Sequence, residues 1–122
     1  MKLSKIVLGT ALIIFPLFGE KYYLSSISYG SKQEAVDSKE AFIEILDNQK
    51  RFGGKSVCNN FMGSWNNKNE IKGVGSTMMM CSEPEMRLER KILTILNNST
   101  IKFENKNIVV ANGYGKLIFV AK

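Results

Sequence analysis

The stretch GGKSVCNNFMGSW (residues 53–65), together with GSTMMMC (residues 75–81), decides how this chain of 122 residues is interpreted. The two stretches contain both cysteines, the single tryptophan and four of the six methionines. Such a cluster is either a site that carries out chemistry or the cross-link and core of a small fold. The apolar fraction of 44% and the charged fraction of 23% are typical of a globular protein, and the length predicts one domain.

The N-terminus differs in character from the rest of the chain. Lys2 and Lys5 precede IVLGTALIIFPLF (residues 6–18), an uncharged run that is too short, at about 1.5 Å per helical residue, to cross a hydrocarbon layer of roughly 30 Å. A basic start, an apolar run and the small residue Gly19 are typical of a secretory signal. We predict a signal peptide at residues 1–19 and a domain at residues 20–122 that is periplasmic or secreted. The alternative is an uncleaved N-terminal segment that anchors the protein in the inner membrane, because LFGE is a poor cleavage site.

The charges argue against a nucleic-acid partner. The net charge is +6, but both signs are interspersed in KNEIK (68–72), MRLERK (86–91) and KFENK (102–106). Nucleic-acid-binding proteins concentrate lysine and arginine on one face. We therefore expect no nucleic-acid partner, and membrane contact only through the signal segment if it stays uncleaved.

Export changes the interpretation of the two cysteines. Thiols outside the cytosol meet an oxidising environment, and small domains there gain stability from cross-links. Cys58 and Cys81 allow one intramolecular disulfide, which loop-closure entropy makes worth roughly 3 kcal/mol. The alternatives are two reduced thiols or a metal-binding pair.

Hydrophobic alternation predicts four strands before the helix. They cover residues 21–30, 41–47, 56–65 and 71–80, and the first has Tyr23, Ser25, Ile27 and Tyr29 on one face. Residues 31–40 are polar and predict a loop. The Gly53-Gly54 pair predicts a bend or bulge in the turn that precedes Ser56.

CSEPEMRLERKILTILNN (residues 81–98) is the clearest helix. Ser82 or Glu83 can cap it, Pro84 fits its first turn, and the helical spacing gives one apolar stripe, Leu88, Ile92, Ile95 and Leu96. Residues 100–122 predict three short strands split at residues 105–107 and 112–115. The fold class is therefore α+β, mostly antiparallel β, with a curved sheet packed on one amphipathic helix and one disulfide.

Two linked motifs resemble the META domain family, which includes the HslJ-like heat-shock proteins. The matching residues are Gly54, Cys58, Asn59, Phe61 and Gly63, followed by Thr77, Met79 and Cys81 and then an acidic amphipathic helix. The resemblance covers most of residues 40–122. It implies a mostly β domain, exported or attached to the envelope, with paired cysteines in a disulfide and a link to heat shock and stress response, but no agreed biochemical activity. The chain lacks a lipobox cysteine, so lipid anchoring does not carry over.

Catalysis and cofactor binding find little support. The chain contains no histidine, which excludes Ser-His-Asp and Cys-His arrangements within it. Glu83, Glu85 and Glu89 are interpreted as a solvated helix face. We expect no enzyme activity and no cofactor.

The methionines have two possible roles. Met78 and Met80 offer soft sulfur ligands that suit Cu(I), with Met79 and Cys81 on the other face of a predicted strand. Methionine also fills irregular cores, and core packing is the preferred interpretation over a metal site.

The remaining candidate is an interaction surface, formed by Asn60, Trp65, Asn66, Asn67 and Tyr114, whereas Asn59 is expected to satisfy buried backbone groups. We therefore predict an exported, non-enzymatic monomer with an unknown protein partner in the envelope, acting in stress tolerance or protein interaction. The alternatives are a periplasmic inhibitor of the lysozyme type or a weak Cu(I)-binding protein.

Overall fold

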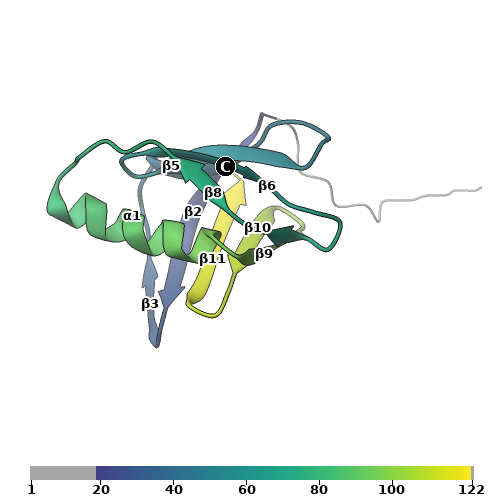
Figure 1. The fold of residues 1–122 in the computed structure, drawn as a ribbon. Helices are drawn as coiled ribbons and strands as arrows, with labels where there is room; N and C mark the ends of the chain where they lie inside the picture. The colour runs from purple at the N-terminus through teal and green to yellow at the C-terminus, as the bar shows by residue number, and fades with distance from the viewer. Residues whose placement is uncertain (1–18, 122) are drawn as a thin grey trace, which may run out of the picture.

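The computed structural model describes residues 19–121 as a curved antiparallel sheet and one helix (Figure 1). The predicted signal peptide, apart from Gly19, lies outside the described residues. The elements follow the chain as β2 (Lys21–Tyr29), β3 (Lys32–Ala35), β4 (Ala41–Ile45), β5 (Arg51–Ser56), β6 (Asn60–Ser64), β7 (Glu70–Ile71), β8 (Val74–Ser76), α1 (Glu83–Leu96), β9 (Ser99–Glu104), β10 (Asn107–Ala111) and β11 (Gly115–Ala121). Within the described part of the chain, no helix is long and apolar enough to span a membrane.

The sheet curves until its two ends nearly meet. Its strand order is β7-β9-β10-β11-β2-β4-β5-β6-β8, and β3 pairs with the half of β2 that β4 leaves free. The end strands β7 and β8 are neighbours in sequence, separated only by Lys72 and Gly73. Next to β7, Asn69 extends the pairing of β7 with β9: its carbonyl oxygen accepts from the Ile101 N–H at 2.9 Å, and its Nδ2 donates to the Ile101 carbonyl at 3.1 Å.

The helix packs its apolar stripe onto this sheet. Ile92, Ile95 and Leu96 are fully buried, and Leu88 packs at the edge of the core, as the helical spacing predicted. α1 contacts β5 on one side of the curved sheet and β10 and β11 on the other, and Figure 1 shows it lying across the sheet. The predicted fold class is therefore confirmed.

Polar side chains fix both ends of α1. At the N-terminus, the Glu85 carboxylate accepts from the Ser82 N–H at 3.1 Å, which forms part of a capping box. At the C-terminus, Asn112 Nδ2 lies within 3.0 Å of the carbonyl oxygens of Thr94, Ile95 and Asn97. These are carbonyl groups that a helix leaves without internal partners, so Asn112 ties the β10–β11 hairpin to the end of the helix.

Two segments predicted as loop or turn are strands. β3 lies within the predicted loop at residues 31–40, and β5 covers the Gly53-Gly54 pair. Gly54 is required inside β5 because an added Cβ would clash with the Phe42 carbonyl oxygen and the Phe61 ring. The glycine therefore marks close packing of three strands rather than a bend.

The strand predicted at residues 56–65 is interrupted. β5 ends at Ser56 and β6 begins at Asn60, and between them Val57 adopts a φ of 85°. This left-handed conformation is rare for a β-branched residue, so sequence pattern alone gives no signal for the turn. The predicted strand at residues 71–80 likewise consists of two short strands and stops at Ser76.

β2 buries a different set of side chains from the predicted one. Tyr22, Leu24 and Ile27 are buried, whereas Tyr23 and Ser25 are not. The pairing with β11 shifts at this point: Phe119 is opposite Leu24 and Ile118 is opposite Ser26, which leaves Ser25 as an extra residue. A bulge of this kind reverses the alternation, and strict alternation cannot anticipate it.

Candidate functional site

The Cys58–Cys81 disulfide connects the turn after β5 to the segment that leads into α1. The two Cα atoms lie 6.1 Å apart, and the Cys58 side chain is buried. The predicted disulfide is confirmed, so neither sulfur is available as a thiolate ligand. The bridge brings the end of β5 and the start of α1 together at one place on the molecule.

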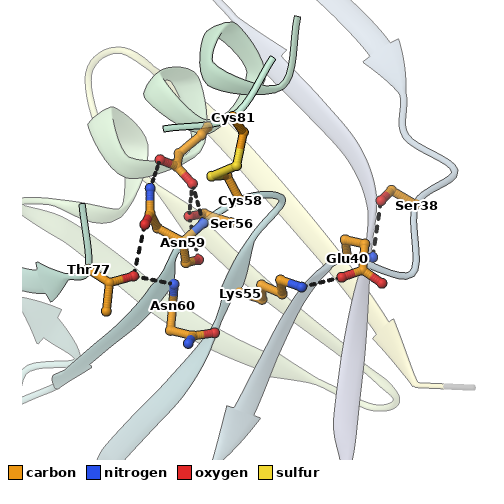
Figure 2. A network of polar contacts seen from close by, with 10 residues as sticks. Ser38, Glu40, Lys55, Ser56, Cys58, Asn59, Asn60, Thr77 and Cys81 are labelled. Atoms are coloured by element: carbon orange, nitrogen blue, oxygen red, sulfur yellow. Dashed lines mark hydrogen bonds and ion pairs between the residues drawn. A yellow bond between two sulfur atoms is a disulfide. The ribbon is translucent and has the colours of Figure 1, made fainter. Parts of the chain in front are cut away.

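Glu89 lies buried beside this bridge and is held by hydrogen bonds from neutral donors. Only 3% of the residue is exposed. Its Oε1 accepts from the Ser56 hydroxyl at 2.8 Å and from the Asn59 N–H at 2.7 Å, and its Oε2 accepts from Asn59 Nδ2 at 2.6 Å. Figure 2 shows this network, with Ser56 and Asn59 next to the disulfide. A helix side chain is thereby fixed to the turn between β5 and β6.

Two opposing effects set the ionisation of Glu89. Burial raises the pKa of this carboxyl group, but the hydrogen bonds from Asn59 and Ser56 lower it more, so that the pKa is below its ordinary value of 4.5. Glu89 is therefore an ionised, buried carboxylate at neutral pH.

The interpretation of Glu89 as part of a solvated helix face is wrong. Its spacing of three residues from Ile92 and seven from Leu96 places it on the buried stripe, and this was the available signal.

Asn59 continues the network toward the chain before Cys81. Its Oδ1 accepts from the Met79 N–H at 2.6 Å and from the Thr77 hydroxyl at 2.9 Å, and its Nδ2 also donates to the Met79 carbonyl at 3.1 Å. Thr77 in turn exchanges hydrogen bonds with the backbone of Asn60 at 3.0 Å. The expectation that the Asn59 side chain satisfies backbone groups is confirmed, and these are the partly buried N–H and carbonyl of Met79.

These contacts hold residues 78–80, the methionine segment, on the surface. The exposed fractions of Met78, Met79 and Met80 are 89%, 54% and 85%, and Met62 on the neighbouring strand β6 is 62% exposed. The preferred interpretation of the three as core packing is wrong, and so is the strand alternation predicted for them. The reason is that the Met79 backbone pairs with the Asn59 side chain rather than with another strand.

Trp65 is mainly a core residue. It is half-buried, with its ring centroid 6.3 Å from that of Phe52 and 5.2 Å from that of Phe103. The Trp65 ring is therefore already packed within the domain. Only its exposed part could belong to the predicted interaction surface.

The other predicted interaction residues lie at separate places. Asn60 is exposed at the start of β6, beside Thr77. Asn66 and Asn67 lie beyond the other end of β6, where Asn66 Oδ1 accepts two backbone N–H groups of its own turn and Asn67 Oδ1 accepts from the Lys50 ammonium. Tyr114 is 63% exposed in the hairpin between β10 and β11. The five residues do not form one patch, and only Asn60 adjoins the methionine segment.

No cluster of three metal-ligating His, Cys, Asp or Glu side chains occurs within residues 19–121. The alternative Cu(I) ligands Met78 and Met80 are both at the surface.

Comparisons with known proteins place this architecture in a family. The META domain family model matches residues 16–122. An NMR structure of a protein from Burkholderia xenovorans is similar with a TM-score of 0.64 at 21% identity, over 87% of this chain and 83% of that one. A second NMR structure has a TM-score of 0.61 at 22% identity, over 85% and 90% of the two chains. No curated protein matches. Since the family model covers nearly the whole sequence, the chain belongs to the META domain family.

Proposed function

We propose that this protein is exported and acts in the bacterial envelope as a non-enzymatic, monomeric interaction domain that contributes to stress tolerance. The disulfide supports the compartment, because such bonds form and persist mainly outside the cytosol. The apolar N-terminal run in the sequence is consistent with the same route.

The observation that carries the proposed interaction is the exposed methionine segment. Three consecutive apolar side chains lie at the surface while the backbone beneath them is held by Asn59 and by the Cys81 bridge. Exposed apolar patches commonly mark interaction sites, and methionine adapts well to partners of irregular shape. A fixed backbone also lowers the entropy lost on binding.

The buried polar groups support a structural role rather than a catalytic one. Glu89 is the buried carboxylate of the site, and its oxygens are occupied by Ser56 and Asn59. The chain supplies no histidine that could act as a general base beside it.

Export is tested by the intact mass of the protein recovered from the envelope fraction without reducing agent. We expect a chain that begins near Glu20 and is lighter by two hydrogens than the reduced form. A full-length chain with free thiols would contradict both export with cleavage and the disulfide in the cell.

The interaction is tested by placing a photo-reactive amino acid at position 80, with exposed position 102 on β9 as the matched control. We expect a discrete cross-linked partner from position 80 only, which disappears when Met78 and Met79 are changed to serine. Equal cross-linking from both positions would contradict a role for the methionine segment. If the captured partner is a muramidase that the purified protein inhibits, the inhibitor alternative replaces the general interaction domain.

A further inference from the structure

We propose that Met78 and Met80 form a reversible oxidation site, which takes up oxygen from two-electron oxidants such as peroxide while the fold stays intact. This role is independent of whether the methionine segment binds a partner. It rests on the exposure of the two thioethers and on the way the backbone between them is held.

The chemistry requires only an accessible sulfur. The thioether sulfur attacks one oxygen of hydrogen peroxide and the O–O bond breaks; the leaving hydroxide takes the proton of the transferred hydroxyl group, so that a sulfoxide and one water molecule result. Met78 and Met80 are 89% and 85% exposed, so the oxidant reaches both sulfurs without any opening of the fold. Met86 on α1 is partly buried and serves as the internal comparison.

The anchored backbone explains why oxidation should be tolerated. Sulfoxide formation makes an apolar side chain polar, which disrupts a core but not a surface. The Met79 N–H and carbonyl are bound by Asn59, Thr77 is bound to Asn60, and Cys81 is held by the disulfide. None of these contacts uses the sulfur of Met78 or Met80.

The exposure of Met78 and Met80 also allows their oxidation to be reversed. A sulfoxide reductase that uses a dithiol returns the thioether, and the two thiols become a disulfide as water is released. Such an enzyme must reach the side chain in the folded protein, and the two sulfoxides at the surface meet this requirement. The segment would then consume oxidant repeatedly rather than once.

The test exposes the folded, disulfide-bonded protein to hydrogen peroxide and follows each methionine by peptide mass spectrometry. We expect Met78 and Met80 to be oxidised at least about fivefold faster than Met86. The oxidised protein should keep its Tm to within about 2 °C, and a sulfoxide reductase with dithiothreitol should remove the added oxygen atoms without denaturant. The variant M78L/M80L should take up two fewer oxygen atoms in the fast phase.

Three results would each overturn the proposal. They are oxidation of Met86 at a rate similar to that of Met78 and Met80, a larger fall in Tm on oxidation of the wild type than on oxidation of M78L/M80L, and reduction that proceeds only after unfolding. The M78L/M80L variant isolates the contribution of Met78 and Met80, because it keeps the other methionines and its folded state should match that of the wild type before peroxide is added.

Discussion

Replacing Glu89 with glutamine removes the charge from the buried network while keeping nearly the same size. The amide oxygen of the introduced glutamine can still accept from the Ser56 hydroxyl and the Asn59 N–H. Its new NH2 group, however, faces Asn59 Nδ2, which is also a donor. Asn59 cannot turn its amide over without losing the contacts of its Oδ1 with Thr77 and Met79.

The expected cost follows from the number of bonds affected. One charge-assisted hydrogen bond is lost and two are weakened, and hydrogen bonds to charged groups are worth about 1.5–3 kcal/mol each. We expect the free energy of unfolding to fall by about 2–3 kcal/mol, out of roughly 5–15 kcal/mol for a domain of this size. Glu89→Ala, which leaves the Asn59 N–H and one Nδ2 hydrogen of Asn59 buried without an acceptor, should cost about 3–5 kcal/mol.

Urea denaturation followed by the fluorescence of Trp65 measures these changes. Trp65 is the single tryptophan and packs against Phe52 and Phe103, so its emission reports on the core. The slope of the unfolding curve should stay constant while the midpoint falls. Glu104→Gln, a charge-neutralising change at an exposed position on β9, should alter the stability by less than about 0.5 kcal/mol.

The effect of pH gives a second measure of the same network. The pKa of Glu89 is lowered in the folded protein, so its contribution is fully present above the ordinary value of 4.5 and is lost as the pH falls through the lower folded pKa. The difference in stability between the wild type and Glu89→Gln should therefore shrink as the pH falls below 4.5. A difference under about 0.5 kcal/mol at neutral pH, or one that stays constant at acidic pH, would refute the reasoning.

Three further changes should give clear results in the same urea titration. The double variant C58S/C81S should lose about 3 kcal/mol and should match the wild type under reducing conditions; equal stability of the oxidised wild type and the variant would contradict a formed bridge. Asn112→Ala should cost about 2 kcal/mol, because the last carbonyl groups of α1 lose their donor, and an unchanged midpoint would contradict this capping role. Gly54→Ala should cost about 3 kcal/mol or more, whereas Gly75→Ala, with nothing within 4 Å of the added Cβ, should cost under about 0.5 kcal/mol; similar effects of the two would argue against the close approach of β4, β5 and β6.

The features that the sequence made predictable are those with local causes. The helix at Glu83–Leu96 was visible from Ser82, Pro84 and its apolar stripe, and the last three strands from their turn residues. The cysteine pair was predictable because two cysteines allow one connection. Each of these inferences depends on residues that are near one another in sequence or few in number.

The features that were missed depend on contacts between distant segments. Gly54 lies in a strand because Phe61 and β4 approach it, and its own neighbours in sequence contain no sign of this. The spacing of Glu89 along the helix indicated the buried face, but its partners were not predictable, because Ser56 and Asn59 supply three donors from another part of the chain. The exposure of Met78 and Met80 has the same origin, since the Asn59 side chain replaces a strand partner. Single-sequence patterns predict that apolar residues are buried and charged residues exposed. Tertiary contacts give the opposite result for Glu89 and for Met78 and Met80.

The pairing of β2 with β11 has a consequence for the order in which the protein can fold. It aligns Tyr22 with Ala121, so the centre of the sheet joins the two ends of the described chain. Contacts of such long range make folding slow and prevent completion until almost the entire chain has been synthesised. Cys58 and Cys81 both precede β9, so their bridge can form on a partial chain that is still open. Because the sheet closes only after β11 is available, a protein exported as proposed could enter a translocation pore that accepts only extended polypeptide before its sheet has closed.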